Sequence, residues 1–392
     1  MGMTDLLARL AARRVHVLTV EVPGDWVVRA EVERSLAARG WCAAVSPADA
    51  DVLAVCGDPG PQLTEVIERI WDQLPGPRVR IDVDDRRSVD SALDRAAGEL
   101  LDSARHREDA HDRTQSPGVR DHGDDHGGMD DEDIHDGMDH GAMAHDGMAH
   151  GGNHGMHHGA MEMAPAGIAL AEGAQDRDGL EMDVLHLHLG PLLEHWPAGL
   201  VLRCSLHGDV LAEAEAWIVD PDHVDSRHPM PTENNASLIA ARQCDHVVDV
   251  LALAGWSRAS ATARQARDLL LGGSDAEKVQ QLLEKLHGML GRSRLLRWSL
   301  RDFAALTAQD LQRLGLPTAL AGDTYDRLLT RVALARTLLR EPWSATVFGV
   351  SATSIADVLP GLVRGLDVAT ARLVVASLGI DTGARDESNT HG

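Results

Sequence analysis

The sequence predicts an α/β unit with a parallel sheet at residues 1–105, a linker at 106–179, an α+β unit at 180–385 and a tail at 386–392. Strand-like apolar runs alternate with helical patterns in the first unit, which is typical of α/β folds. The linker has no apolar periodicity. The last unit begins with alternating apolar runs and then shows apolar residues three and four positions apart, the pattern of amphipathic helices.

The elements of the first unit follow one another in a strand–helix order. Strands are expected at 15–22, 41–47, 51–57 and 78–83, and helices at 25–40, 59–76 and 87–106. Gly40 ends the first helix, and a Pro–Gly pair ends the second. This order predicts a small doubly wound, flavodoxin-like domain with a parallel sheet.

The linker consists mainly of Asp, His, Gly and Met. Residues 106–164 cannot bury enough apolar surface to offset the conformational entropy of the chain, so we expect them to be disordered without a ligand.

The last unit opens with three alternating runs, Leu185–Leu189, Leu200–Leu206 and Val210–Val219. The His–Gly–Asp turn at 207–209 separates the second run from the third, and together they predict an antiparallel β-meander. A helical bundle should follow, with helices at 237–256, 260–273, 274–298, 323–343 and 355–379.

The charge and the cysteines limit the function. The net charge of −24 repels phosphate, so we expect no nucleic-acid partner. The four cysteines (Cys42, Cys56, Cys204 and Cys244) form no CxxC pair and predict neither a disulfide framework nor a thiolate cluster. No signal peptide or membrane span is recognisable, which favours a soluble cytoplasmic protein.

Residues 46–83 carry a family resemblance. Their sequence, SPADADVLAVCGDPGPQLTEVIERIWDQLPGPRVRIDV, has an Ala–Asp–Val strand at 50–52, a glycine loop at Gly57 and a Gln–x–Pro–x–Pro–Arg ending at 73–78. It resembles the electron-relay (NADH-quinone oxidoreductase B-like) subunit of respiratory complex I. The small subunit of membrane-bound nickel–iron hydrogenases shares that fold.

Residues 185–220 carry a second resemblance, to the opening hairpin of the catalytic large (D-like) subunit of the same enzymes. The matching residues are Gly190–Pro191, Arg203 and Gly208–Asp209–Val210. The two resemblances support each other, because they imply two neighbouring subunits of one complex fused in one chain.

The resemblance does not extend to the redox centres. The relay subunit holds a four-iron cluster on four cysteines, yet residues 21–26 and 82–88 contain none at the corresponding places. The two CxxC pairs that hold nickel and iron in hydrogenases are also missing. In complex I the hairpin tip offers a His to the quinone; here the tip, 192–199, is two residues longer and His195 is only nearby. We therefore expect no catalytic residues and no iron–sulfur cluster.

The linker contains a repeated unit close to His–x–Gly–Met–x. Its five-residue period matches neither a helix nor a strand, so it does not build one face of either. Thioether and imidazole together suit Cu(I), whereas imidazole with carboxylate suits Cu(II), Ni(II) or Zn(II). The candidate metal ligands are His135, Met138, His140, Met143, His145, Met148, His150, His154, Met156, His157 and His158. The alternative is a hydrophilic linker without a metal function.

Three weaker candidates lie outside the linker. His186 and His188 share one face of a strand and could form a metal site with His195 or His207, although such residues are more often half-buried strand positions with hydrogen bonds. Cys56 ends a strand where α/β sheets bind ligands, but a buried structural cysteine is the simpler interpretation. The third candidate is a basic group that could dock an acidic partner or be a solvated face: Arg292, Arg294, Arg297 and Arg301.

Three functions remain open from these observations. The first is a non-catalytic subunit of a complex I-like or hydrogenase-like membrane oxidoreductase, with antiporter-like membrane-arm subunits and metal ions as partners. Such a subunit would be cytoplasmic, or peripheral on the inner face of the cell membrane. The second is a cytoplasmic protein that stores or delivers copper or nickel, and the third is an active quinone-linked oxidoreductase subunit.

Overall fold

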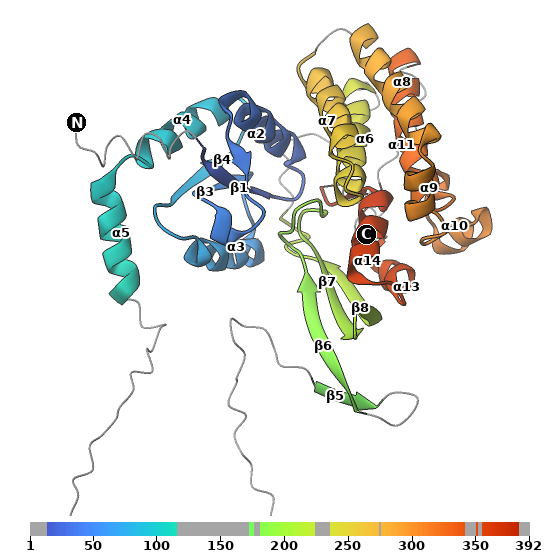
Figure 1. Ribbon diagram of the computed structural model, residues 1–392, viewed down its shortest axis with the longest axis horizontal. Helices are drawn as coiled ribbons and strands as arrows, with labels where there is room; N and C mark the ends of the chain where they lie inside the picture. Colours follow the sequence, from blue (N-terminus) through green and yellow to red (C-terminus); the bar gives the residue numbers. More distant parts are fainter. Residues whose placement is uncertain are drawn as a thin grey trace, which may run out of the picture.

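The computed structural model describes residues 14–115, 172–175, 181–223, 236–273, 276–341, 350–351 and 355–383. An α/β unit stands beside a bundle of helices, and an antiparallel sheet extends below the bundle (Figure 1). The predicted order of an α/β part followed by an α+β part is therefore confirmed.

The α/β unit contains a four-stranded parallel sheet in the order β2-β1-β3-β4. Its strands are β1 (His16–Glu21), β2 (Cys42–Ala43), β3 (Val52–Cys56) and β4 (Val79–Val83). All five residues of the central strand β3 are buried, which explains its continuous apolar run. The second strand is shorter than the 41–47 expected, because both of its residues are exposed at the edge of the sheet.

Different partners cover the two faces of this sheet. Helices α2 (Trp26–Arg39) and α4 (Val89–Glu99) pack on one face through residues such as Val32 and Leu93. Helix α3 (Pro61–Gln73) packs on the other face, where Val201 and Val219 of the C-terminal unit join the same apolar cluster. The two units therefore share part of one core.

Helix α5 (Ser103–Gln115) extends into the segment expected to be linker. It has no apolar face, and polar contacts attach it instead: Nη2 of buried Arg78 lies 3.0 Å from Oδ1 of Asp109. The linker is also shorter at its other end, where β5 (Glu172–Gln175) pairs with the next strand. The remainder of 106–179 lies outside the described residues.

The predicted meander is confirmed as the antiparallel strands β6 (Glu181–Leu189), β7 (Leu200–His207) and β8 (Val210–Ile218). The turn at 207–209 lies between β7 and β8. Strand β5 extends the sheet to the order β5-β6-β7-β8.

The helical region also agrees with the prediction, with three differences. Its helices are α6 (Ala236–Leu253), α7 (Ser257–Leu271), α8 (Ala276–Arg292), α9 (Arg294–Leu300), α10 (Ala308–Leu314), α11 (Thr324–Arg340), α13 (Leu359–Val363) and α14 (Val368–Leu378). The helix expected over 274–298 is divided, because the hydroxyl of Ser293 accepts from the backbone N–H of Leu296 and begins a new helix. Helix α10 was not expected; it begins at a capping box formed by Thr307 and Asp310. The helix expected over 355–379 is divided at Gly365, whose φ is 82°, after which Asp367 caps a new helix.

A short parallel pair, β9 (Val350–Ser351) and β10 (Ile380–Asp381), lies next to the bundle. None of the helices in the described part of the chain combines the length and apolarity that crossing a bilayer requires.

Candidate functional site

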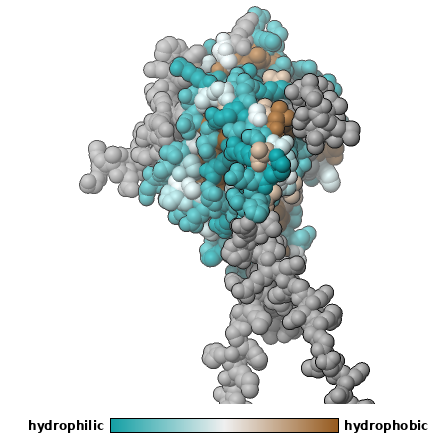
Figure 2. Space-filling model, turned by 90° about the vertical axis from the view of Figure 1, so that its left-hand side faces the viewer, coloured by the Kyte–Doolittle hydropathy of each residue, from teal (hydrophilic) through white to brown (hydrophobic). Residues whose placement is uncertain are grey.

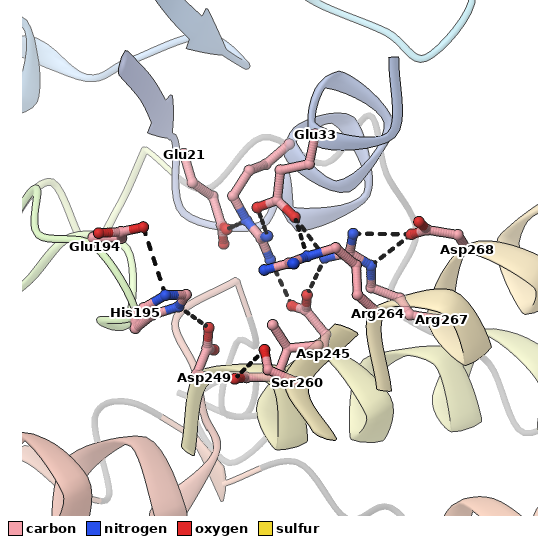
Figure 3. A network of polar contacts seen from close by, with 12 residues as sticks. Glu21, Glu33, Glu194, His195, Asp245, Asp249, Ser260, Arg264, Arg267 and Asp268 are labelled. Atoms are coloured by element: carbon pink, nitrogen blue, oxygen red, sulfur yellow. Dashed lines mark hydrogen bonds and ion pairs between the residues drawn. The ribbon is translucent and has the colours of Figure 1, made fainter. Parts of the chain in front are cut away.

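The predicted His/Met metal ligands, from His135 to His158, lie outside the described residues. Within the described residues, the most concentrated polar feature is a group of buried and half-buried charges between α2 of the α/β unit and α6 and α7 of the bundle (Figure 3). We call this group the junction cluster; its members are Glu21, Arg29, Glu33, Arg242, Asp245, Arg267 and Asp268.

Asp245 of α6 lies at the centre of the junction cluster, and its side chain is fully buried. Its carboxylate accepts from three guanidinium groups: Nη2 of Arg29 at 2.6 Å, Nη1 of Arg242 at 2.8 Å and Nη1 of Arg267 at 2.8 Å. Arg29 comes from the α/β unit, so this carboxylate joins the two units directly.

Glu33 of α2 reaches the bundle in the opposite direction. Its Oε2 accepts from Nη1 of Arg267 at 2.9 Å, while its Oε1 accepts from Arg29. Nε of Arg267 also donates to Asp268 at 2.9 Å. Each unit thus contributes both a cation and an anion, and the charges alternate across the boundary.

Burial penalises each of these charges, and the neighbouring opposite charges compensate. Burial alone would raise the pKa of Asp245, but Arg29 and Arg267 outweigh it and hold that pKa well below its usual value. The same holds for Glu33. Burial would raise its pKa, but Arg29 and Arg267 outweigh burial and lower the pKa to about 2. These groups are therefore charged at neutral pH and depend on one another, since removing one leaves its partners buried and uncompensated.

Glu21, at the end of β1, behaves differently. It accepts from Nε of Arg29, yet its burial is the dominant influence and raises its pKa. Burial likewise raises the pKa of Asp268, against the opposing effect of Arg267. The cluster therefore contains two carboxyl groups, Glu21 and Asp268, that take up a proton more readily than Glu33 and Asp245.

His195 lies beside the junction cluster, at the tip between β6 and β7. Its Nδ1 is 3.0 Å from Oδ1 of Asp249, which is one helical turn after Asp245, and its Nε2 is 3.6 Å from Glu194. Burial lowers the pKa of His195, but the hydrogen bond and charge of Asp249 outweigh it and raise the pKa overall. The backbone of His195 has a φ of 57°, a conformation that non-glycine residues adopt rarely. The hairpin tip is thus held on α6 by a contact that depends on protonation.

The arrangement can hold two units in one orientation and respond to protons. The arginines remain charged, and the thiols near the cluster are not activated: burial raises the pKa of Cys244 to about 12 and also raises that of Cys56. Thiolates are the reactive form of cysteine, so neither side chain is suited to nucleophilic or redox chemistry.

The four cysteines lie in four different elements. Cys42 is exposed on β2, while Cys56, Cys204 and Cys244 are buried in three separate apolar clusters. Cys56 is therefore a buried core residue, in agreement with its simpler interpretation. No two of these thiols share a cluster in which they could bind one metal centre together.

The proposed histidine site on the meander is not assembled. Nδ1 of His186 is 3.1 Å from the hydroxyl of Ser205, and the ring of His188 meets Trp217 edge-on with centroids 6.2 Å apart. His195 instead pairs with Asp249. Among the described residues, no three His, Cys, Asp or Glu side chains are grouped as a metal site would require.

Sequence reasoning did not identify the junction cluster. A signal was present, because Asp245 lies within the apolar helical stretch CDHVVDV and Arg267 precedes the apolar end of α7. A charged residue at a core position of an amphipathic helix requires a partner, but the sequence does not show which distant residue supplies it.

Known proteins add no assignment to this geometry: no family model matches the chain, and no curated protein is similar to it.

Proposed function

We propose that this protein is a non-catalytic subunit of a complex I-like or hydrogenase-like membrane oxidoreductase. In this role the two folded units keep the shapes of an electron-relay subunit and a large subunit, and they dock as one body on membrane-arm, antiporter-like subunits. The His/Met tract would add a binding site for Cu, Ni or Zn.

The observation that carries the proposal is the junction between the two units. The two units that contain the resembling segments lie against each other, with Asp245 and Glu33, which lie outside those segments, each paired to arginines across the boundary. Val201 and Val219 complete the apolar covering of the parallel sheet from the other side of that boundary. A fusion of two subunits that function together would require such a permanent contact.

The position of the thiols supports a role without a redox centre. A four-iron cluster requires about four thiolates at one point. The chain has four cysteines, and they are distributed over β2, β3, β7 and α6. The scaffold would therefore assemble with other subunits rather than carry electrons itself.

A second function, storage or delivery of copper or nickel, is favoured by a separate observation. Eleven His and Met side chains lie within residues 135–158, a density that suits soft and borderline metal ions. In this second function the two units would serve as docking modules for metal-exporting or metal-receiving proteins.

Affinity purification of the full chain from its native cells in mild detergent tests the first function. We expect multi-spanning, antiporter-like proteins to co-purify in fixed ratio, as identified by mass spectrometry. A variant lacking residues 121–163 should retain these partners and lose bound metal, measured by elemental analysis.

The outcomes separate the functions. A wild-type sample in which no membrane subunit co-purifies would contradict the first function. Metal transporters as co-purifying proteins, with metal tolerance lost in the deletion variant, would favour the second. Iron and acid-labile sulfide in stoichiometric amounts would contradict a non-catalytic role.

A further inference from the structure

Helix α9 presents an exposed surface that combines cations with large apolar side chains. We call it the α9 surface; its members are Arg294, Leu295, Arg297, Trp298 and Arg301. Leu295 and Trp298 are 72% and 70% exposed, although Leu and Trp side chains of this size are normally at least partly covered.

Helical geometry explains how these residues come to lie together. At 3.6 residues per turn, Arg294, Trp298 and Arg301 follow one another along one face. Leu296 and Leu300 point the other way and are buried in the bundle. Leu295 lies one turn before Trp298, so the outward face has an apolar half and a basic half.

The cations of the α9 surface are available. Among the described residues, no carboxylate lies within ion-pair distance of Arg294 or Arg297; Arg301 has only the neighbouring, exposed Asp302 at 3.3 Å. Arg292, at the end of α8, is exposed beside them. This concentration of positive charge stands out on a chain with a net charge of −24.

The position of α9 leaves this surface accessible. The helix lies on the side of the bundle remote from the α/β unit (Figure 1). The opposite side, seen in Figure 2, is mostly hydrophilic with a few small apolar spots.

We propose that the α9 surface docks the protein on an anionic membrane surface. Trp and Leu insert at the boundary between headgroups and acyl chains, while arginines beside them bind lipid phosphates. The net negative charge does not prevent this, because salt screens charges over about 8 Å and only the local cations act at contact. An acidic protein with an apolar pocket is the alternative occupant, and it is one outcome of the test below. The inference does not depend on the proposed function.

Sedimentation of the full chain with vesicles tests the proposal. One set of vesicles contains phosphatidylglycerol and phosphatidylcholine, and the other contains phosphatidylcholine alone. We expect binding to the first set, with little to the second. The double variant R294E/R297E should bind about tenfold more weakly or worse, since each cation near an anionic surface contributes roughly one factor of five. The variant L295S/W298S should also bind more weakly, with the loss persisting at high salt.

The charge-matched control is R69E/R87E, which changes two exposed arginines on the α/β unit. It should bind as the wild type does. Thermal unfolding of each variant shows whether it is folded. We expect all of them to fold, because the substituted side chains are exposed. Equal binding by R294E/R297E and R69E/R87E, or no binding of the wild type to the anionic vesicles, would overturn the proposal. The proposal would also be overturned if the wild type bound no vesicles but co-purified with an acidic protein that R294E/R297E no longer retained. In that case the α9 surface binds a protein.

Discussion

His195 is the residue at which protonation affects the contact between the hairpin tip and α6. Its pKa is raised by Asp249 against the opposing effect of burial. A histidine with a raised pKa in the folded state contributes stability that is complete below its unfolded pKa, about 6.5, and is lost as the pH rises through the folded value. Buried His246 acts in the opposite sense, because burial and then Arg242 and Arg331 hold its pKa well below 6.5.

We therefore expect His195→Asn to remove one step of the pH dependence. Asparagine tolerates a positive φ and lacks the titrating group, so the variant should lose about 1 kcal/mol of stability at pH 6 and less at pH 9. Denaturant unfolding across this pH range measures the difference. Asp249→Asn should produce the same flattening, whereas His188→Asn, on β6 with its ring against Trp217, should leave the step intact. A step that persists in His195→Asn would contradict the assignment.

The elements differ in how well their sequences predict them, and the reason is the kind of contact that stabilises each. Strand β3 is buried on both faces, so its continuous apolar run is enough to predict the strand from the sequence. Helix α5 has no apolar face; it is held by Arg78 and by the contact of Nη1 of Arg113 with the carbonyl of Leu74 at 3.3 Å. Such contacts join residues far apart in sequence, and no local pattern reveals them.

Asp109 should therefore control the attachment of α5 to the sheet. Asp109→Asn removes a carboxylate that accepts from Nε and Nη2 of Arg78 at 3.2 and 3.0 Å. We expect local opening of 103–115 to become easier by roughly 1–2 kcal/mol, the size of a charge-assisted hydrogen bond, with β4 unaffected. Hydrogen exchange measures this directly. Glu108→Gln, at an exposed position on the same helix, is the control. Equal exchange rates in both variants would show that α5 is held by other contacts.

At the scale of the whole molecule, the two units form one body. The order of α/β and α+β units follows from apolar periodicity, so the sequence predicts it. Apolar periodicity does not predict the junction cluster, because Asp245 and Arg29 are 216 positions apart and only the folded chain brings them together. Trp26 adds an apolar part to the same boundary: it begins α2 but is buried among residues of α6, α7, α8 and α11.

This boundary should hold the units together without a covalent link. A specific protease site inserted between Gly151 and Gly152 allows the purified chain to be cut, and a denaturing gel confirms complete cleavage. We expect the two fragments to elute as one species in gel filtration at physiological salt, because the shared apolar core and the ion pairs remain. Asp245→Ala in the same cut chain removes the buried carboxylate that Arg29, Arg242 and Arg267 share, which costs about 3–5 kcal/mol and should separate the fragments at low concentration. Asp302→Ala removes an exposed carboxylate at a remote site and should have no effect. Separate elution of the wild-type fragments would mean that the junction is too weak to join the units, and the argument for a fused pair of subunits would lose its main support.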